Sequence, residues 1–151
     1  MLTPADSYPA LRQLRVIDAA HPGLISCSLD TPLPTVARMM ATYRVHAILV
    51  TAHGDEVLPG GGHWGIVSDT DLLRAAEAGD IEEIEARSIA ATPVLMVAGS
   101  HELAHAAQLM AEHELSHLIV VERTSQRPIG VLSTLDIVRA LAGFTGAPLA
   151  I

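Results

Sequence analysis

The sequence predicts an α+β fold built from two copies of one unit. A short stretch occurs twice, at 65–72 and 130–137, and in each copy a glycine and aliphatic residues lead into Ser-x-x-Asp and an apolar helical pattern. This pattern is typical of a strand, a tight turn and a helix start. The segments before both copies also follow one order of strand-like runs and a helical stripe. Tandem repetition of a unit of about 60 residues explains both observations.

Composition limits the class of protein. The chain has 151 residues, 50% of them hydrophobic but only 3% aromatic, so we expect a sizeable aliphatic core. A net charge of −8 argues against a basic face for nucleic acid. The single cysteine, Cys27, excludes an intramolecular disulfide, and we expect a buried, inert thiol. With no signal-peptide pattern and no apolar stretch of about 18 residues, we expect a cytoplasmic protein without a membrane span.

The first repeat is predicted over residues 16–79, after a lead-in at 1–15 with a short helix. A helical turn over 16–22 is stopped by proline, and an extended run follows at 24–28. Asp30 or Thr31 is the expected N-cap of an amphipathic helix. The buried stripe of this helix follows from the helical spacing of Leu33, Val36, Ala37, Met40 and Ala41.

A hairpin and a closing helix complete the first repeat. Aliphatic runs at 45–51 and 64–67 predict two strands, joined by a glycine-rich connection at 53–63. The closing helix is predicted over 70–79, with Gly79 as its C-cap.

The second repeat is predicted over residues 88–143, between a linker at 80–87 and a tail at 144–151. Its predicted elements are a helical turn at 88–93, a strand at 94–97, a helix stripe at 103–111, strands at 117–121 and 127–132, and a closing helix at 135–142. Matched residues are separated by 70 positions for Leu33 and Leu103, by 71 for His46 and His117, and by 65 for Ser68 and Ser133. These offsets predict that the first repeat lacks one residue near Tyr43 and Arg44 and has six extra residues in its hairpin loop.

The repeated Ser-x-x-Asp has two interpretations. In a capping box, Ser68 or Ser133 accepts a bond from the backbone N–H three residues on, and Asp71 or Asp136 accepts one from the serine N–H. Alternatively, a helix N-terminus with a hydroxyl and a carboxylate beside it suits a phosphorylated ribose. Both interpretations remain open at this point.

The second repeat resembles the cystathionine β-synthase (CBS) domain at almost every patterned position, from Ser-Ile-Ala-Ala-Thr-Pro-Val at 88–94 to Gly-Val-Leu-Ser-Thr-Leu-Asp-Ile at 130–137. The first repeat is similar but looser, and the resemblance covers about residues 16–143. It implies two β-α-β-β-α units packed sheet to sheet through a pseudo-twofold axis, with two clefts between them. In that family the clefts bind adenosine-containing ligands such as AMP, ADP, ATP or S-adenosylmethionine, and pairs commonly form disc-like dimers.

The resemblance also implies roles for individual residues. Asp71 and Asp136 look like ribose-binding residues, since a carboxylate can accept from both hydroxyls of a cis-diol. Ser68 and Ser133 look like phosphate contacts, and we favour the second-repeat pair because its setting is better preserved. The adenine edge would be read by the backbone of Arg44, Val45, His46, Ala47, Leu115, Ser116, His117 and Leu118. The side chains of Ile25 and Leu95 would flank the base.

Other chemistry is less well supported by the sequence. His101 and His105 are four residues apart, and His53 and His63 flank the glycine-rich loop, but we expect solvated side chains there rather than a metal site. We interpret His46 and His117 as equivalent structural residues. No nucleophile and base stand at a plausible spacing, so we expect no enzyme.

The resulting hypothesis is a stand-alone CBS pair that acts as a cytoplasmic regulatory sensor. Binding of an adenosyl ligand would change its shape or its affinity for a protein partner in trans, and the chain would form a homodimer. We expect no required cofactor and no nucleic-acid or membrane partner. The alternative is a ligand-free CBS dimerisation or partner-binding module that retains the fold and the caps.

Overall fold

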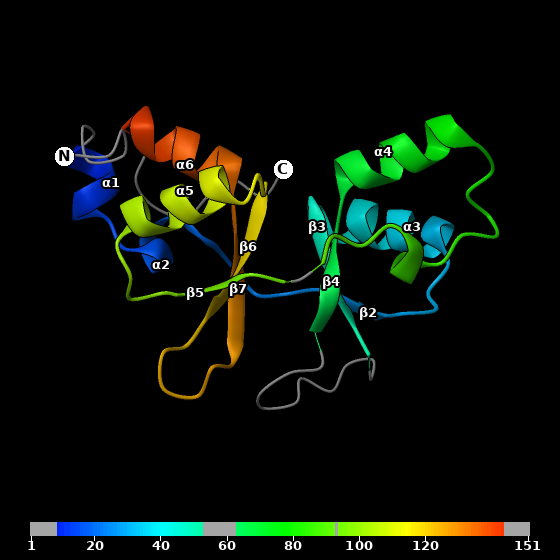
Figure 1. Cartoon of the computed structure of the whole chain (residues 1–151), viewed down its shortest axis with the longest axis horizontal. Coiled ribbons are helices and arrows are strands. Elements are labelled where there is room, and N and C mark those ends of the chain that lie inside the picture. Colours follow the sequence, from blue (N-terminus) through cyan, green and yellow to red (C-terminus); the bar gives the residue numbers. More distant parts are fainter. Residues whose placement is uncertain (1–8, 53–62, 93, 144–151) are drawn as a thin grey trace. The chain divides into compact units, whose positions relative to one another are not determined.

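The computed structural model describes residues 9–52, 63–92 and 94–143. It has the mixed α+β architecture that the sequence predicts, with two sheets and flanking helices (Figure 1). The chain divides into two compact units. We call residues 24–94 the first-repeat unit, and residues 9–23 together with 95–143 the second-repeat unit. Residues 16–23, which begin the first repeat along the sequence, therefore share a core with the second.

The first-repeat unit is built on a three-stranded sheet of order β2-β3-β4. Strand β2 is parallel to β3, and β3 pairs with β4 as an antiparallel hairpin. Helix α3 supplies the crossover that a parallel pair requires. The elements are β2 (Ser26–Ser28), α3 (Leu33–Tyr43), β3 (Ala47–Thr51), β4 (His63–Ser68), α4 (Asp69–Ala78) and the 3₁₀ turn η2 (Ala86–Ser88).

Aliphatic packing stabilises this unit. Every residue of β3 is buried, and α3 contributes Leu33, Val36 and Met40 to the same core. These are positions that the helical spacing predicts, whereas Ala41 of the same predicted stripe is exposed. Full burial of one such side chain contributes about 1.5–3 kcal/mol.

The second-repeat unit has a four-stranded sheet of order β1-β7-β6-β5. It repeats the parallel pair and the hairpin of the first, with β5 parallel to β6 and β6 antiparallel to β7. Helix α1 lies against α5 and α6 (Figure 1). The elements are α1 (Pro9–Gln13), α2 (Val16–Ala19), β1 (His21–Pro22), β5 (Met96–Ala98), α5 (Leu103–Glu112), β6 (His117–Val121), β7 (Pro128–Ser133) and α6 (Thr134–Leu141).

In both units the last hairpin strand pairs with a segment that begins the other repeat. His21 of β1 lies opposite Val131 of β7, and Ala91 forms a single antiparallel bridge to Ile66 of β4. The helical turn predicted to extend to Pro22 ends with α2 at residue 19, because Pro22 pairs with β7 as part of β1.

Two glycines make these pairings possible. A β-carbon at Gly130 would lie 2.3 Å from the carbonyl oxygen of His21, and one at Gly65 would lie 2.6 Å from the carbonyl oxygen of Ala91. No side chain fits at such distances from a backbone atom. Glycine is therefore required where the segment crosses each hairpin strand.

The strand registers correct the predicted alignment of the two repeats. Ala47 lies opposite Ser68 in the first hairpin, and His117 lies opposite Ser133 in the second. Ala47 and His117 differ by 70 positions, the same offset as the preceding helices, so the first repeat lacks no residue at the turn before β3. The predicted equivalence of His46 and His117 is wrong by one position.

The hairpin loop accounts for the remaining difference in length. Thr51 pairs with His63, 12 positions later, whereas Val121 pairs with Pro128, 7 positions later. The first repeat thus has five extra residues in this loop, not the six predicted.

The turn after the amphipathic helix of each repeat has a left-handed backbone. Arg44 has φ 54° and Glu114 has φ 52°, and the two exposed residues are 70 positions apart. This region of backbone space favours glycine. Arg44 therefore occupies the position at which the sequence alignment predicted a missing residue.

The predicted N-cap of α3 is wrong. The N-cap residue is Pro32, which has no side-chain cap bond. Thr31 Oγ1 instead accepts from the backbone N–H of Ser28 at 3.1 Å. The Ser28 hydroxyl donates to Asp30 at 2.7 Å, and this bond is the main cause that lowers the pKa of Asp30. Both predicted cap residues are thus engaged in the turn before the helix.

The helices are short. The longest one described, α3, has 11 residues, whereas a membrane span requires about 20. None of the described helices is long and apolar enough to cross a bilayer.

We expect Gly130→Ala to lower the free energy of unfolding by about 1–3 kcal/mol, because the added carbon would collide with backbone that cannot rotate away. The matched control is Gly79→Ala. Gly79 is the C-cap of α4, as predicted, has no neighbour within 4 Å of an added carbon, and is expected to tolerate the change within about 0.5 kcal/mol. Urea unfolding monitored by circular dichroism measures both. Equal stability of the two variants would contradict the close approach.

Cys27 is buried, as predicted, with 6% of its surface exposed. Burial raises the pKa of its thiol, and a hydrogen bond with Thr31 opposes this with a smaller effect. Since the thiolate is the reactive form, iodoacetamide at pH 8 should alkylate the urea-unfolded chain at least about tenfold faster than the folded one. Equal rates, measured by intact mass, would contradict the burial.

The same shift predicts a pH dependence of stability. Because the folded thiol has the higher pKa, its ionisation favours the unfolded chain, so stability should fall as pH rises above about 9. Cys27→Val, which introduces the residue found at the equivalent position 97, should reduce that fall.

Candidate functional site

The site is built on the turn that joins each hairpin to its closing helix. In the second-repeat unit, Ser133 Oγ accepts from the backbone N–H of Asp136 at 3.3 Å. Asp136 Oδ2 accepts from the backbone N–H of Ser133 at 2.8 Å and from its hydroxyl at 3.0 Å. This is the reciprocal capping box that the sequence predicts.

The first-repeat unit has the same cap. Ser68 Oγ accepts from the backbone N–H of Asp71 at 3.2 Å, and Asp71 Oδ2 accepts from that of Ser68 at 2.9 Å. Thr70, which is replaced by Leu135 in the second repeat, forms a hydroxyl–hydroxyl bond with Ser68 at 2.9 Å. The cap interpretation of Ser-x-x-Asp is thus confirmed in both repeats, and it leaves one oxygen of each carboxylate outside the cap.

The outer oxygen of Asp136 faces a histidine from the start of the chain. His21 Nε2 lies 3.0 Å from Asp136 Oδ1, close enough for an ion pair when the imidazole is protonated. The Asp136 side chain is fully buried, and among the described residues no donor is aligned on Oδ1 as a hydrogen bond. A buried acceptor without an aligned donor costs about 1–3 kcal/mol, and more when charged. Asp136 therefore has an oxygen whose bonding is incomplete.

Asp71 has different surroundings. Its side chain is partly exposed, and within the described part of the chain its hydrogen bonds are the two of the cap. Ile66 and Val131 each lie two residues before the cap serine, and Ala91 lies opposite Ile66 as His21 lies opposite Val131. The first repeat thus has a methyl group at the register position where the second has an imidazole.

The beginnings of the middle strands adjoin these caps. In the second-repeat unit, His117 lies opposite Ser133, and the Ser116 carbonyl accepts from the N–H of Thr134 at 3.0 Å. The Ser116 hydroxyl and His117 Nδ1 are 3.0 Å apart. Two of the predicted adenine-edge residues are therefore bonded to the same turn as the cap.

The first-repeat unit has an equivalent arrangement with different chemistry. Ala47 lies opposite Ser68, and the His46 carbonyl accepts from the N–H of Asp69 at 2.9 Å. The His46 ring also contacts Asp69 Oδ2 at 2.9 Å, with both side chains about half exposed. Since Thr134 replaces Asp69 in the second repeat, that unit has no carboxylate at this position.

The other predicted site residues have mainly structural contacts. The carbonyls of Ile25 and Leu95 accept from β3 and β6 residues in equivalent bonds of 3.0 and 3.1 Å, and both side chains pack against their cores. Leu118 is fully buried, and Arg44 is exposed. Val45 and Leu115 pack against the cores of their own units.

His21 is the site residue that the sequence reasoning missed. No motif surrounds it, and Pro22 led to its interpretation as the end of a helical turn. The repeat itself could have indicated this residue. His21 and Ala91 are 70 positions apart, which is the offset that relates the two repeats, and a glycine occurs in the last hairpin strand of each repeat.

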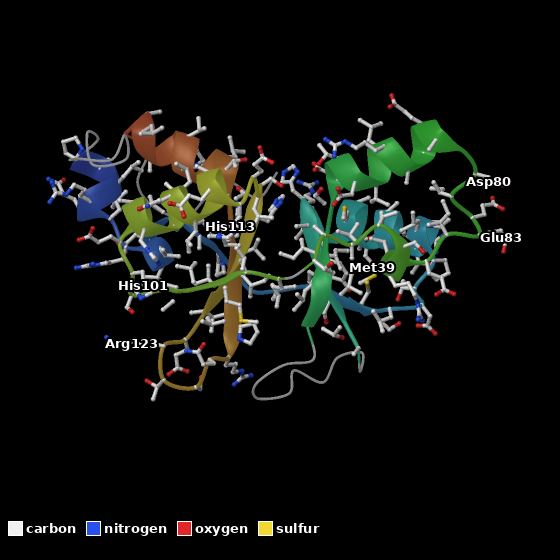
Figure 2. All side chains as sticks on the ribbon, viewed as in Figure 1. Met39, Asp80, Glu83, His101, His113 and Arg123 are labelled. Carbon is white, nitrogen blue, oxygen red and sulfur yellow. The ribbon has the colours of Figure 1, made fainter. Side chains whose placement is uncertain are left out.

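Metal ligation has little basis in the described residues. No three His, Cys, Asp or Glu side chains there lie close enough together to hold a metal ion. His101 precedes α5 and His113 follows it (Figure 2), and the rings of His101 and His105 pack edge to face at 4.9 Å. The loop between His53 and His63, where we expect solvated side chains rather than a metal site, lies outside the described residues.

Comparison with known protein families detects both repeats. A family model described as "CBS domain" matches the chain twice, at residues 16–78 and 86–143. The comparison with curated proteins finds no match.

The solved structures with similar folds include the following three. The CBS domain pair of protein MJ0100, in complex with 5′-methylthioadenosine and S-adenosyl-L-methionine, is 18% identical, with 85% of this chain and 96% of that chain covered and a TM-score of 0.70. The CBS domain of a bacterial CNNM/CorC family Mg²⁺ transporter in complex with ATP is 16% identical, with 89% and 92% covered and a TM-score of 0.70. A hexameric CBS-CP12 protein from bloom-forming cyanobacteria is 18% identical, with 83% and 69% covered and a TM-score of 0.71.

At these identities the structural likeness establishes the fold, and the two family-model matches cover most of the chain. The duplicated hairpin, the parallel strand pair and the capped closing helix all agree with this result. The chain belongs to the CBS domain family, as a tandem pair.

Proposed function

We propose that this protein is a regulatory sensor that binds an adenosine-containing ligand, of the class of AMP, ADP, ATP or S-adenosylmethionine, through the capped turns of its repeats. Ligand binding stabilises the conformation that binds more tightly, and thereby changes the affinity for a partner protein. The observation that carries the proposal is the carboxylate at the third position of each closing helix, which keeps one oxygen outside the cap.

The chemistry of the turn supports this ligand class. A carboxylate oxygen accepts from ribose hydroxyls, while the first turn of α4 or α6 supplies the partial positive charge that favours a phosphate. Arg74 and Arg139 lie three residues after the aspartate in each repeat, and we expect these side chains to neutralise phosphate charge. Two of the structurally similar proteins were solved with adenosyl compounds or ATP bound.

Isothermal titration with AMP, ATP and S-adenosylmethionine tests the proposal. We expect the native chain to bind at least one of them, and the double variant Asp71→Asn/Asp136→Asn to lose that binding, because asparagine can still cap the helix but lacks the charged acceptor. The loss should be at least about tenfold in affinity.

A charge-matched control separates a local effect from a change in net charge. Asp80→Asn/Glu83→Gln also removes two negative charges, from exposed residues in the segment after α4 (Figure 2), and should bind as the native chain does. Absence of heat in all variants, with no thermal stabilisation at millimolar ligand, would contradict the sensor and favour the ligand-free dimerisation or partner-binding module.

We also propose that the chain forms a homodimer through α6. Leu135, Val138 and Leu141 follow one another at three-residue intervals on this helix, and their exposed fractions are 54%, 55% and 44%. Leu73 on α4, which is equivalent to Val138, is 62% exposed. Exposed apolar residues that recur at one position of the closing helices are suited to an interface between copies.

Val138→Asp should convert the dimer to a monomer, because it would bury an unpaired charge in the interface. Thr134→Asp is the control, since it adds the same charge at the N-terminus of the same helix, where the helix dipole favours it. Light scattering after size-exclusion chromatography gives the mass of each. A native chain that is monomeric at about 100 µM would contradict this interface. A Val138→Asp variant that remains dimeric would also contradict it.

A further inference from the structure

We infer that His21 competes with a bound ribose for Asp136, so that the two repeats are unequal and Asp71 is the carboxylate that engages ligand first. This inference rests on the proposed function and identifies which repeat performs it. It also reverses the preference for Ser133 and Asp136 that the sequence alone suggests.

The two carboxylates differ in accessibility. The side chain of Asp136 is fully buried, with His21 Nε2 at 3.0 Å from Oδ1 and the Ser133 backbone and hydroxyl on Oδ2. Neither oxygen can accept from a ligand hydroxyl while His21 remains in place. Asp71 is partly exposed, and within the described residues only its Oδ2 is engaged, in the cap.

The hydrogen bonding of Asp136 is incomplete at Oδ1. No donor in the described part of the chain is aligned on Oδ1, although His21 is close to it. A ribose hydroxyl in that place can donate with better alignment, so Oδ1 can still accept a ligand once the imidazole has moved away. The His21 side chain is 32% exposed, which leaves room for that movement. Asp136 is therefore a latent site.

The asymmetry between the two repeats originates at one register position. His21 and Ala91 occupy corresponding register positions, opposite Val131 in one unit and Ile66 in the other. Alanine has neither a donor nor the length to reach a carboxylate. A single residue difference thus separates the two repeats, and it can be exchanged in both directions.

Titration calorimetry with AMP, ATP and S-adenosylmethionine tests the inference on the full chain. In the native protein, Asp71→Asn should weaken the first binding event at least roughly tenfold, and by clearly more than Asp136→Asn does. His21→Ala should add a second binding event, and that event should disappear in His21→Ala/Asp136→Asn.

The reciprocal variant transfers the histidine. Ala91→His places an imidazole opposite Ile66, at an exposed position, and should weaken the first binding event by roughly tenfold. Ala91→Phe adds a ring without a donor and should have a smaller effect. His21→Gln retains an N–H donor at a similar reach and should keep the second event suppressed. Thermal unfolding of each variant establishes that it is folded, and if His21→Ala is not, the comparison of Ala91→His with Ala91→Phe decides the question.

The outcomes separate this inference from the proposed function. If none of the three ligands binds to any variant, the sensor itself is excluded. If ligand binds but Asp136→Asn weakens it as much as Asp71→Asn does, or folded His21→Ala adds no second event, the sensor stands and the competition by His21 is overturned. Equal effects of Ala91→His and Ala91→Phe would likewise overturn it.

Discussion

The fold of each repeat depends on the capped turn between the hairpin and the closing helix. One serine and one aspartate satisfy backbone N–H groups that the helix start would leave unpaired, and the carbonyl before the middle strand accepts another bond from the same turn. The turn thereby fixes the helix to the hairpin. It also holds a carboxylate oxygen beside a helix N-terminus, so that the structural role and the proposed ligand role use different atoms of the same side chain.

The two repeats share a backbone but differ in chemistry. Each hairpin strand accepts a crossing segment, and Gly65 and Gly130 permit its close approach. The residue on that segment is free to vary because its backbone makes the pairing. His21 at one crossing and Ala91 at the other therefore change the surroundings of the two carboxylates without any change of fold. A single residue difference in a duplicated protein can thus make its two sites unequal.

Most of the fold could be predicted from the sequence, because its signals are local. The stripe of α3, the strand at 117–121 and both capping boxes follow from spacing and turn chemistry. The strand register could not be predicted in the same way, because matching the two repeats by residue identity aligns His46 with His117. Only the pairing of Ala47 with Ser68 shows that Ala47 is the residue equivalent to His117. His21 was missed for a related reason, because its contact with Asp136 joins residues 115 positions apart.

We expect a ligand to engage the two capped turns in order, Asp71 before Asp136. Amide resonances of the backbone report it directly in a ¹H–¹⁵N titration of the native chain with AMP or, if AMP does not bind, with ATP or S-adenosylmethionine. The signals of Ser68 and Asp71 should shift at lower ligand concentration than those of Ser133 and Asp136. Simultaneous shifts at both turns, or earlier shifts at Ser133 and Asp136, would contradict it.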